Sequence, residues 1–138
     1  MITTEANATW NGDLAGGNGT IRSLTLDHPY SFGARFEGEE GLNPEELIGS
    51  ALAGCFAMAL AHGLAEAGHD PESIDARTRV HFDPEGPAIT RIDLVAEGQV
   101  PGLDAEGFRA AAEDAKENCP VSKALAGVEI VLRDARLA

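Results

Sequence analysis

The sequence predicts an α+β domain in which mainly antiparallel strands are combined with one long apolar helix. Segments typical of strands occur near both ends of the chain and in its middle, and they do not alternate regularly with helices. One stretch, residues 44–67, is apolar on all sides and is typical of an internal helix. The 138 residues fit a single domain, residues 1–138.

The N-terminal segment is expected to form a small sheet. Residues 4–11 and 19–26 are typical of strands, and the glycine-rich turn DLAGGNG between them predicts a hairpin. Residues 30–36 are expected to form a third short strand. The polar segment EGEEGLNP that follows is predicted to be a loop.

The strongest helix signal begins directly after this loop. Asn43 is a good N-cap residue, and Pro44 suits the first helical position. Glu45 and Glu46 complement the positive end of the helix dipole. The helix is expected to end at Gly68.

An apolar helix of this length must be covered on every side, which one small sheet cannot do. Gly49, Gly54 and Gly63 would allow close approach of a neighbouring element. We therefore expect a second helix to pack against it, and a homodimer with paired central helices would provide one. Tolerated glycines without a packing role are the simpler alternative.

The C-terminal half is expected to contain three more strands and two helices. Residues 75–82 and 88–100 are typical of strands joined by the turn DPEGP. Asp104 is expected to cap an amphipathic helix that runs to about residue 116. A short helix, VSKAL, and a final strand, VEIVLRDARL, complete the chain.

Composition excludes several classes of function. The formal net charge of −13 repels phosphate backbones, so no nucleic-acid partner is expected. Residues 1–10 lack the basic start and apolar run of a secretory signal. Residues 47–65 approach membrane-spanning length, but they are mostly Ala and Gly, contain His62 and have no basic flank. We expect a cytoplasmic protein with no membrane partner.

The two cysteines, Cys55 and Cys119, are the candidate reactive groups. In a reducing compartment, a catalytic or metal-binding role is favoured over a structural disulfide. Cys55 lies within the apolar helix, where a buried thiol is ordinarily inert and has a raised pKa. Its thiolate would need a nearby cation. His62 is about 10 Å away along the helix, so an arginine from elsewhere would be required.

Cys119 directly precedes Pro120 and a predicted helix, which makes it a candidate N-cap thiol. Two cysteines suffice for peroxidase chemistry, in which one thiol becomes a sulfenic acid and the second closes a disulfide with it. No CxxC or HxxxH spacing predicts a zinc site among the cysteines and four histidines. No hydrolase signature or phosphate loop is present either, and no cofactor is expected.

The motifs NPEELIGSALAGCF, CPVSKAL and RFEGEEGLNPEEL resemble the OsmC family (osmotically inducible protein C) of the OsmC/Ohr organic hydroperoxide resistance superfamily. The resemblance covers nearly the whole chain. It implies a thiol peroxidase in which Cys55 is the peroxidatic and Cys119 the resolving cysteine. It also implies that Arg35 stabilises the Cys55 thiolate and that Glu45 holds Arg35.

The resemblance further implies an intertwined homodimer, with antiparallel sheets around two long central helices and active sites at the subunit interface. The expected substrates are organic hydroperoxides, with hydrogen peroxide used less efficiently, in an oxidative or osmotic stress response. An external dithiol, of which lipoyl-type dithiols are one class, would be the reductant. Phe56 and Met58 are either pocket residues or plain core. Leu42, Leu52 and Ala53 depart from the family pattern; these departures leave catalysis intact, but the resemblance then does not specify the preferred peroxide.

A second interpretation belongs to a different class of protein. A redox sensor or small-ligand-binding protein could use the cysteine pair as a switch without turnover. The third interpretation is a metal-binding domain.

Overall fold

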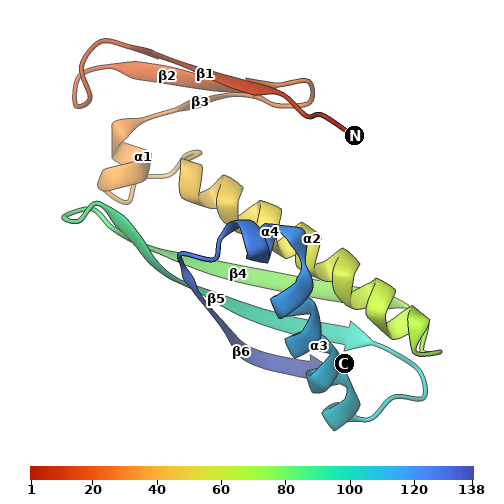
Figure 1. Ribbon diagram of the computed structural model, residues 1–138. Helices are drawn as coiled ribbons and strands as arrows, with labels where there is room; N and C mark the ends of the chain where they lie inside the picture. Colours follow the sequence, from red (N-terminus) through yellow and green to blue (C-terminus); the bar gives the residue numbers. More distant parts are fainter. The chain divides into compact units, whose positions relative to one another are not determined.

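The computed structural model describes residues 1–138 (Figure 1). The elements follow one another in the order β-β-β-α-α-β-β-α-α-β, which agrees with the predicted α+β class. The contacts divide the chain into two compact units, Met1–Glu46 and Leu47–Ala138. Each unit is described by itself.

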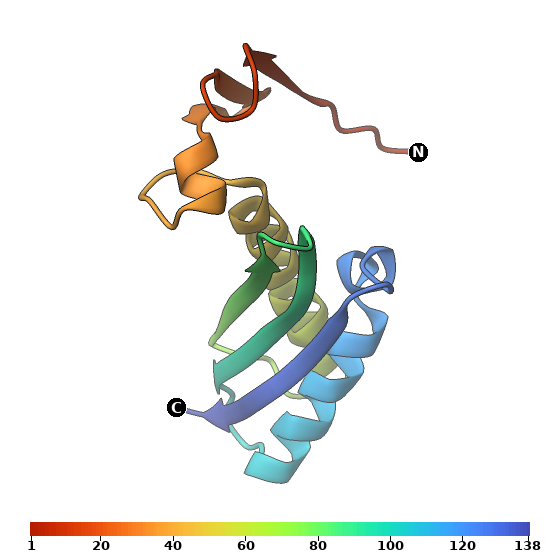
Figure 2. The same cartoon turned by 90° about the vertical axis from the view of Figure 1, so that its left-hand side faces the viewer.

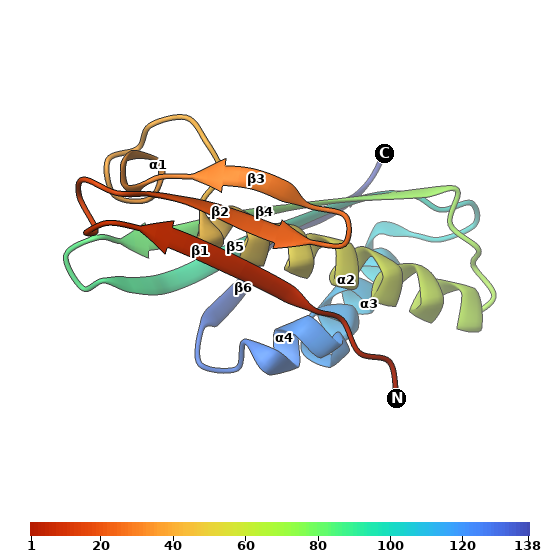
Figure 3. The ribbon, with the colours of Figure 1, turned by 90° about the horizontal axis from the view of Figure 1, so that it is seen from above.

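The first unit contains a three-stranded antiparallel sheet in the order β1-β2-β3 (Figure 3). The strands are β1 (Ala6–Asn11), β2 (Asn18–Ser23) and β3 (Asp27–Tyr30). Trp10 and Tyr30 meet edge to face with 5.3 Å between ring centroids, and a side chain at Gly19 would collide with both. The predicted hairpin is confirmed. Most residues of this sheet are exposed, so it has little core of its own.

The predicted third strand, residues 30–36, is wrong beyond Tyr30. Helix α1 (Phe32–Phe36) replaces it. The Ser31 hydroxyl caps this helix by accepting a hydrogen bond from the Ala34 N–H at 3.0 Å. A local cap of this kind prevails over the strand preference of the aromatic residues in YSFGARF.

Helix α2 (Pro44–Glu66) begins where the sequence predicts. The Asn43 Oδ1 accepts a hydrogen bond from the Glu46 N–H at 2.8 Å, as an N-cap residue does. The helix ends just before Gly68, whose φ of +88° lies in the left-handed region that glycine adopts without strain.

The second unit contains a sheet in the order β4-β5-β6, formed by β4 (Ser73–Asp83), β5 (Ala88–Gln99) and β6 (Glu129–Leu137). Strands β4 and β5 pair antiparallel, whereas β5 and β6 pair parallel. The parallel pair arises because α3 (Ala105–Asn118) and α4 (Pro120–Ala124) carry the chain back to the end of the sheet at which β5 begins, so that β6 runs in the same direction as β5. Helices α2 and α3 lie on the same face of this sheet (Figure 2).

One face of α2 is buried in the core of the second unit. Phe56, Leu60 and Leu64 are at most 2% exposed and pack with residues of β5, β6 and α3. The opposite face is open: Met58 is 77% exposed, and added Cβ atoms at Gly54 or Gly63 would meet nothing within 4 Å. The helix is long and apolar enough to cross a membrane, but only 28% of its most apolar 18-residue window is buried.

The close approach that the glycines predict occurs at Gly49, and its neighbour is a strand. The Thr78 hydroxyl on β4 donates a hydrogen bond to the Gly49 carbonyl at 3.0 Å. A Cβ at Gly49 would lie 2.8 Å from that hydroxyl oxygen. Within one chain, the expected second helix is therefore replaced by the sheet at Gly49, and no helix covers Gly54 or Gly63.

The other face of the second sheet carries a polar network around Asp93 on β5. The Asp93 carboxylate lies 2.8 Å from His81 Nε2 and 2.9 Å from Nε of both Arg91 and Arg133. These partners come from all three strands. The hydrogen bonds from His81 and Arg91, assisted by Arg133, hold the pKa of Asp93 well below its usual range despite an opposing effect of burial.

This network predicts an acid-dependent contribution to stability. Because the folded-state pKa of Asp93 is lowered, its stabilisation is present above the unfolded-state value of about 4 and is lost as the pH falls further. Asp93→Asn should lower the melting temperature at pH 7, and its difference from wild type should shrink below about pH 4. Asp75→Asn, which alters an exposed pair with Arg77, is the matched control. Equal melting temperatures of wild type and Asp93→Asn at pH 7 would contradict this assignment.

Candidate active site

The two cysteines lie side by side in the second unit. Cys55, on α2, is partly buried, and Cys119, between α3 and α4, is fully buried. Both belong to one apolar cluster, whose buried members besides Cys119 are Leu52 and Ile92. The two thiols are free and are hydrogen-bonded to each other. The two sulfurs therefore lie close to one another in the reduced protein.

Local structure at the start of α4 fixes Cys119. Its backbone is extended, and its side chain caps the helix as the sequence predicts. The Ser122 N–H donates a hydrogen bond to Cys119 Sγ at 3.3 Å. The Ser122 hydroxyl lies 3.2 Å from the same sulfur, and Ser122 is itself only 8% exposed. Pro120, at the first helical position, needs no partner for its nitrogen.

The environment of the two thiols lowers the pKa of Cys119 and raises that of Cys55. Burial alone raises the pKa of Cys119, but the hydrogen bonds from the Ser122 hydroxyl and N–H, together with those of Cys55 and the Val121 N–H, outweigh burial. Burial is also the main cause of the raised pKa of Cys55, and the neighbouring Cys119 adds to it. The N–H of Val121 opposes this by hydrogen bonding to Cys55. Within one chain, Cys119 is thus the more acidic thiol.

Arg35 and Glu45 form an ion pair in the first unit. Glu45 Oε1 accepts hydrogen bonds from Arg35 Nη2 at 2.9 Å and Nε at 3.2 Å. The Glu45 side chain is only 7% exposed, whereas that of Arg35 is 38% exposed. The Arg35 guanidinium also lies 5.5 Å from the ring centroid of Phe36. Glu45 Oε2 is buried and accepts no hydrogen bond, so Glu45 holds Arg35 through a single oxygen.

The structure thus brings the four predicted site residues together as two pairs. Cys55 lies with Cys119 in the second unit, and Arg35 lies with Glu45 in the first. His62 is exposed on α2. No group of three or more His, Cys, Asp or Glu side chains is arranged to hold a metal ion.

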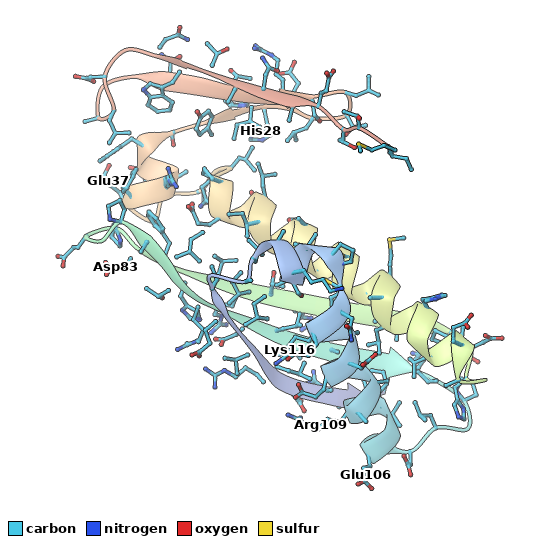
Figure 4. The ribbon with its side chains drawn as sticks, in the orientation of Figure 1. His28, Glu37, Asp83, Glu106, Arg109 and Lys116 are labelled. Atoms are coloured by element: carbon cyan, nitrogen blue, oxygen red, sulfur yellow. The ribbon has the colours of Figure 1, made fainter.

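Sequence reasoning missed Ser122. The available signal was its position three residues after the N-cap cysteine. An N-cap side chain usually accepts a hydrogen bond from the backbone N–H two or three residues further on. Ser122 also borders a groove of about 400 Å³ between the end of α3, α4 and the start of β6. Lys116 of α3, labelled in Figure 4, and Lys123 of α4 line the same groove.

The two apolar residues considered for a substrate pocket lie in different places. Phe56 is completely buried among core residues of α3, β5 and β6, so it belongs to the core. Met58, one turn after Cys55, is 77% exposed. Of the two, only Met58 remains available to a ligand or to a partner chain.

Comparisons with known proteins identify the family of the chain. Residues 37–133 match the family described as OsmC-like protein. Peroxiredoxin OsmC of Escherichia coli (strain K12) is 47% identical over 129 residues, covering 90% of each chain. The crystal structure of the organic hydroperoxide resistance protein OhrB of Bacillus subtilis aligns with a TM-score of 0.65 and 30% identity, over 97% of this chain and 98% of its own.

The crystal structure of an OsmC-like protein from Mycoplasma pneumoniae shares the fold with a TM-score of 0.75, covering 99% of both chains at 14% identity. The mixed arrangement of two sheets and four helices is therefore that of the OsmC/Ohr structures. By the family match and by identity along nearly its full length, the chain belongs to the OsmC-like protein family.

Proposed function

We propose that the protein is a thiol-dependent peroxidase that reduces organic hydroperoxides through Cys55 and Cys119. The observation that carries this proposal is the pair of free, hydrogen-bonded thiols, one of them held at a helix N-cap. A relative that is 47% identical is named a peroxiredoxin, and one that is 30% identical is named for organic hydroperoxide resistance. A peroxidase is the enzyme class that both names indicate.

The reaction begins with attack of the Cys55 thiolate on the distal peroxide oxygen. A sulfur–oxygen bond forms, the O–O bond breaks, and the alkoxide leaves and takes up a proton to become an alcohol. Cys55 is then a sulfenic acid. The Cys119 thiolate attacks the Cys55 sulfur, and hydroxide leaves and becomes water. An external dithiol, supplied in a reducing compartment such as the cytoplasm, reduces the disulfide.

The raised pKa of Cys55 means that its thiolate needs a cation, and Arg35 is the proposed source. Glu45 holds Arg35 and lies in the first turn of α2, ten residues before Cys55. Ten residues correspond to about 15 Å along one helix axis. We therefore infer that the pair from one chain serves Cys55 of a second copy in a homodimer.

The open face of α2 supports this dimer. It presents Met58, which is 77% exposed, and two glycines at which an added Cβ would meet nothing within 4 Å. An exposed apolar face on a helix this long is destabilising in water unless a partner covers it. The α2 helix of a second copy would cover this face, and the sparsely buried sheet of the first unit would also gain a core.

The preference for organic substrates rests on the apolar setting of the thiols. Cys55 packs in a cluster with Leu52, Ile92 and other aliphatic side chains. An alkyl group gains free energy on transfer to such surroundings, whereas hydrogen peroxide has no apolar part.

Steady-state turnover tests the proposal. Wild-type protein at catalytic concentration, supplied with a dithiol, should consume many equivalents of cumene or tert-butyl hydroperoxide, faster than hydrogen peroxide. Protein alkylated at both thiols is the control and should be inactive. If hydroperoxide consumption stops at one equivalent per chain with dithiol still present, the protein is a redox switch without turnover and the peroxidase proposal is wrong.

A further inference from the structure

Ser122 has a polar side chain in contact with the sulfur of Cys119, but the reaction described above gives it no role. Its hydroxyl lies 3.2 Å from Cys119 Sγ, and its N–H donates to the same sulfur at 3.3 Å. Ser122 is buried, with 8% of its surface exposed. A buried hydroxyl needs a hydrogen-bond partner, and the Ser122 hydroxyl is within hydrogen-bond distance of the Cys119 sulfur.

The second half of the reaction demands such a contact. Once Cys55 is a sulfenic acid, Cys119 must attack as a thiolate while it is fully buried. Burial opposes this charge, and Cys119 has no arginine or lysine among the groups that shift its pKa. Two donors from one residue can satisfy the sulfur and direct its remaining lone pair toward Cys55.

Besides Ser122, the groups that lower the pKa of Cys119 are Cys55 and the Val121 N–H. Cys55 of α2 is the titratable group that faces it, and β5 and β6 contribute apolar residues to the shared cluster. The charged groups that border the groove beside Ser122 are Lys116 and Glu117 of α3 and Lys123 of α4. Lys116 is already paired with Glu113 and Glu117.

We propose that Ser122 is a positioning residue for the resolving cysteine: its hydroxyl donates a hydrogen bond to the Cys119 thiolate and thereby sets the rate at which the Cys55 sulfenic acid is converted to the disulfide. This inference rests on the proposed peroxidase function. It assigns Ser122 to the second step alone. Formation of the sulfenic acid depends on Cys55 and its cation, whereas the hydrogen bonds of Ser122 are made to Cys119.

A consequence is control over irreversible oxidation. A sulfenic acid that waits for Cys119 is exposed to a second hydroperoxide molecule, which oxidises it to a sulfinic acid and is itself reduced to an alcohol. Slower closure of the disulfide therefore increases the fraction of Cys55 lost at each peroxide concentration. Ser122 protects the enzyme by shortening the life of the sulfenic acid.

The first test measures both steps in a single turnover. Ser122→Ala, mixed with one equivalent of cumene hydroperoxide and quenched rapidly, should form the sulfenic acid no more slowly than wild type and close the disulfide about tenfold more slowly, as loss of one hydrogen bond to a charged group predicts. At excess peroxide, mass spectrometry should find more sulfinic acid at Cys55. Ser122→Thr, which keeps the hydroxyl, should restore closure, and Ser73→Ala is the matched control for loss of a serine.

The second test does not require peroxidase activity. In a Cys55→Ser background, Cys119 is the remaining thiol, and its thiolate absorbance can be titrated. Adding Ser122→Ala should move this titration to higher pH, whereas adding Ser122→Thr should leave it close to its starting position. Circular dichroism and melting temperature establish that the variants are folded. If Ser122→Ala does not fold, the test rests on Ser122→Thr, whose Cys119 titration should stay close to its starting position.

The outcomes separate the two proposals. If wild type forms no disulfide but the Cys119 titration responds to Ser122, the peroxidase proposal fails and the contact stands. If wild type closes the disulfide and Ser122→Ala closes it equally fast, with an unmoved titration, Ser122 has no role in positioning and the inference is overturned.

Discussion

Cys55→Ser is expected to abolish hydroperoxide turnover, with a loss on the order of a thousandfold or more. A serine hydroxyl ionises far less readily than a thiol and forms no disulfide, so neither half of the reaction can proceed. The measurement is the rate of cumene hydroperoxide loss with excess dithiol. The fold should be little affected, because Cys55 is only partly buried.

Cys119→Ser is the control that assigns the roles of the two thiols. It matters because Cys119, and not Cys55, has the lowered pKa within one chain. If Cys55 is the nucleophile, Cys119→Ser still reduces one equivalent of hydroperoxide and accumulates a sulfenic acid. If Cys55→Ser instead reduces that equivalent and Cys119→Ser does not, the two roles are reversed.

Arg35→Ala should slow the first oxidation of Cys55 by about a hundredfold, because the thiolate loses the cation that offsets its burial. The Cys55 thiolate titration, measured in a Cys119→Ser background, should move to higher pH. Glu45→Gln should give a smaller effect, since Arg35 loses its ion pair but keeps its charge. An unchanged titration in Arg35→Ala would remove Arg35 from the mechanism.

Mixing variants tests whether the arginine comes from a second copy. Arg35→Ala and Cys55→Ser should each lose nearly all activity, but a hybrid dimer contains one site with both wild-type residues. Random reassociation of equal amounts should recover about a quarter of the wild-type activity, since half of the dimers are hybrid and each has one complete site. A mixture as inactive as its components would exclude the shared site.

The sequence predicts the helices well because their ends are set by local chemistry. Asn43 and Pro44 at the start of α2, and Asp104 before α3, act in the structure as they do in isolated capping motifs. The cap at Ser31 is equally local, but the aromatic residues around it favour a strand, and that competition led to the wrong element. The parallel pairing of β6 with β5 depends on where α3 and α4 return the chain, which no local pattern encodes.

In the site, too, some features can be predicted from the sequence and others depend on tertiary packing. The roles of Arg35 and Glu45 follow from resemblance, and the structure adds that they form an ion pair with one carboxylate oxygen left without a partner. The contact of Ser122 with Cys119 is within reach of the sequence, since both lie in CPVSKAL. The proximity of Cys55 to Cys119, 64 positions apart in the chain, results from packing of α2 against the sheet and could not be derived from spacing.

Peptide mapping under non-reducing conditions tests the central claim most directly. Reduced wild-type protein is treated with one equivalent of tert-butyl hydroperoxide, and the alcohol released and the cysteine linkage are measured together. The account predicts one alcohol per chain, a mass lower by that of two hydrogen atoms, and a Cys55–Cys119 disulfide within the same chain. Alcohol released while both thiols stay free, or a disulfide that joins two chains, would contradict it.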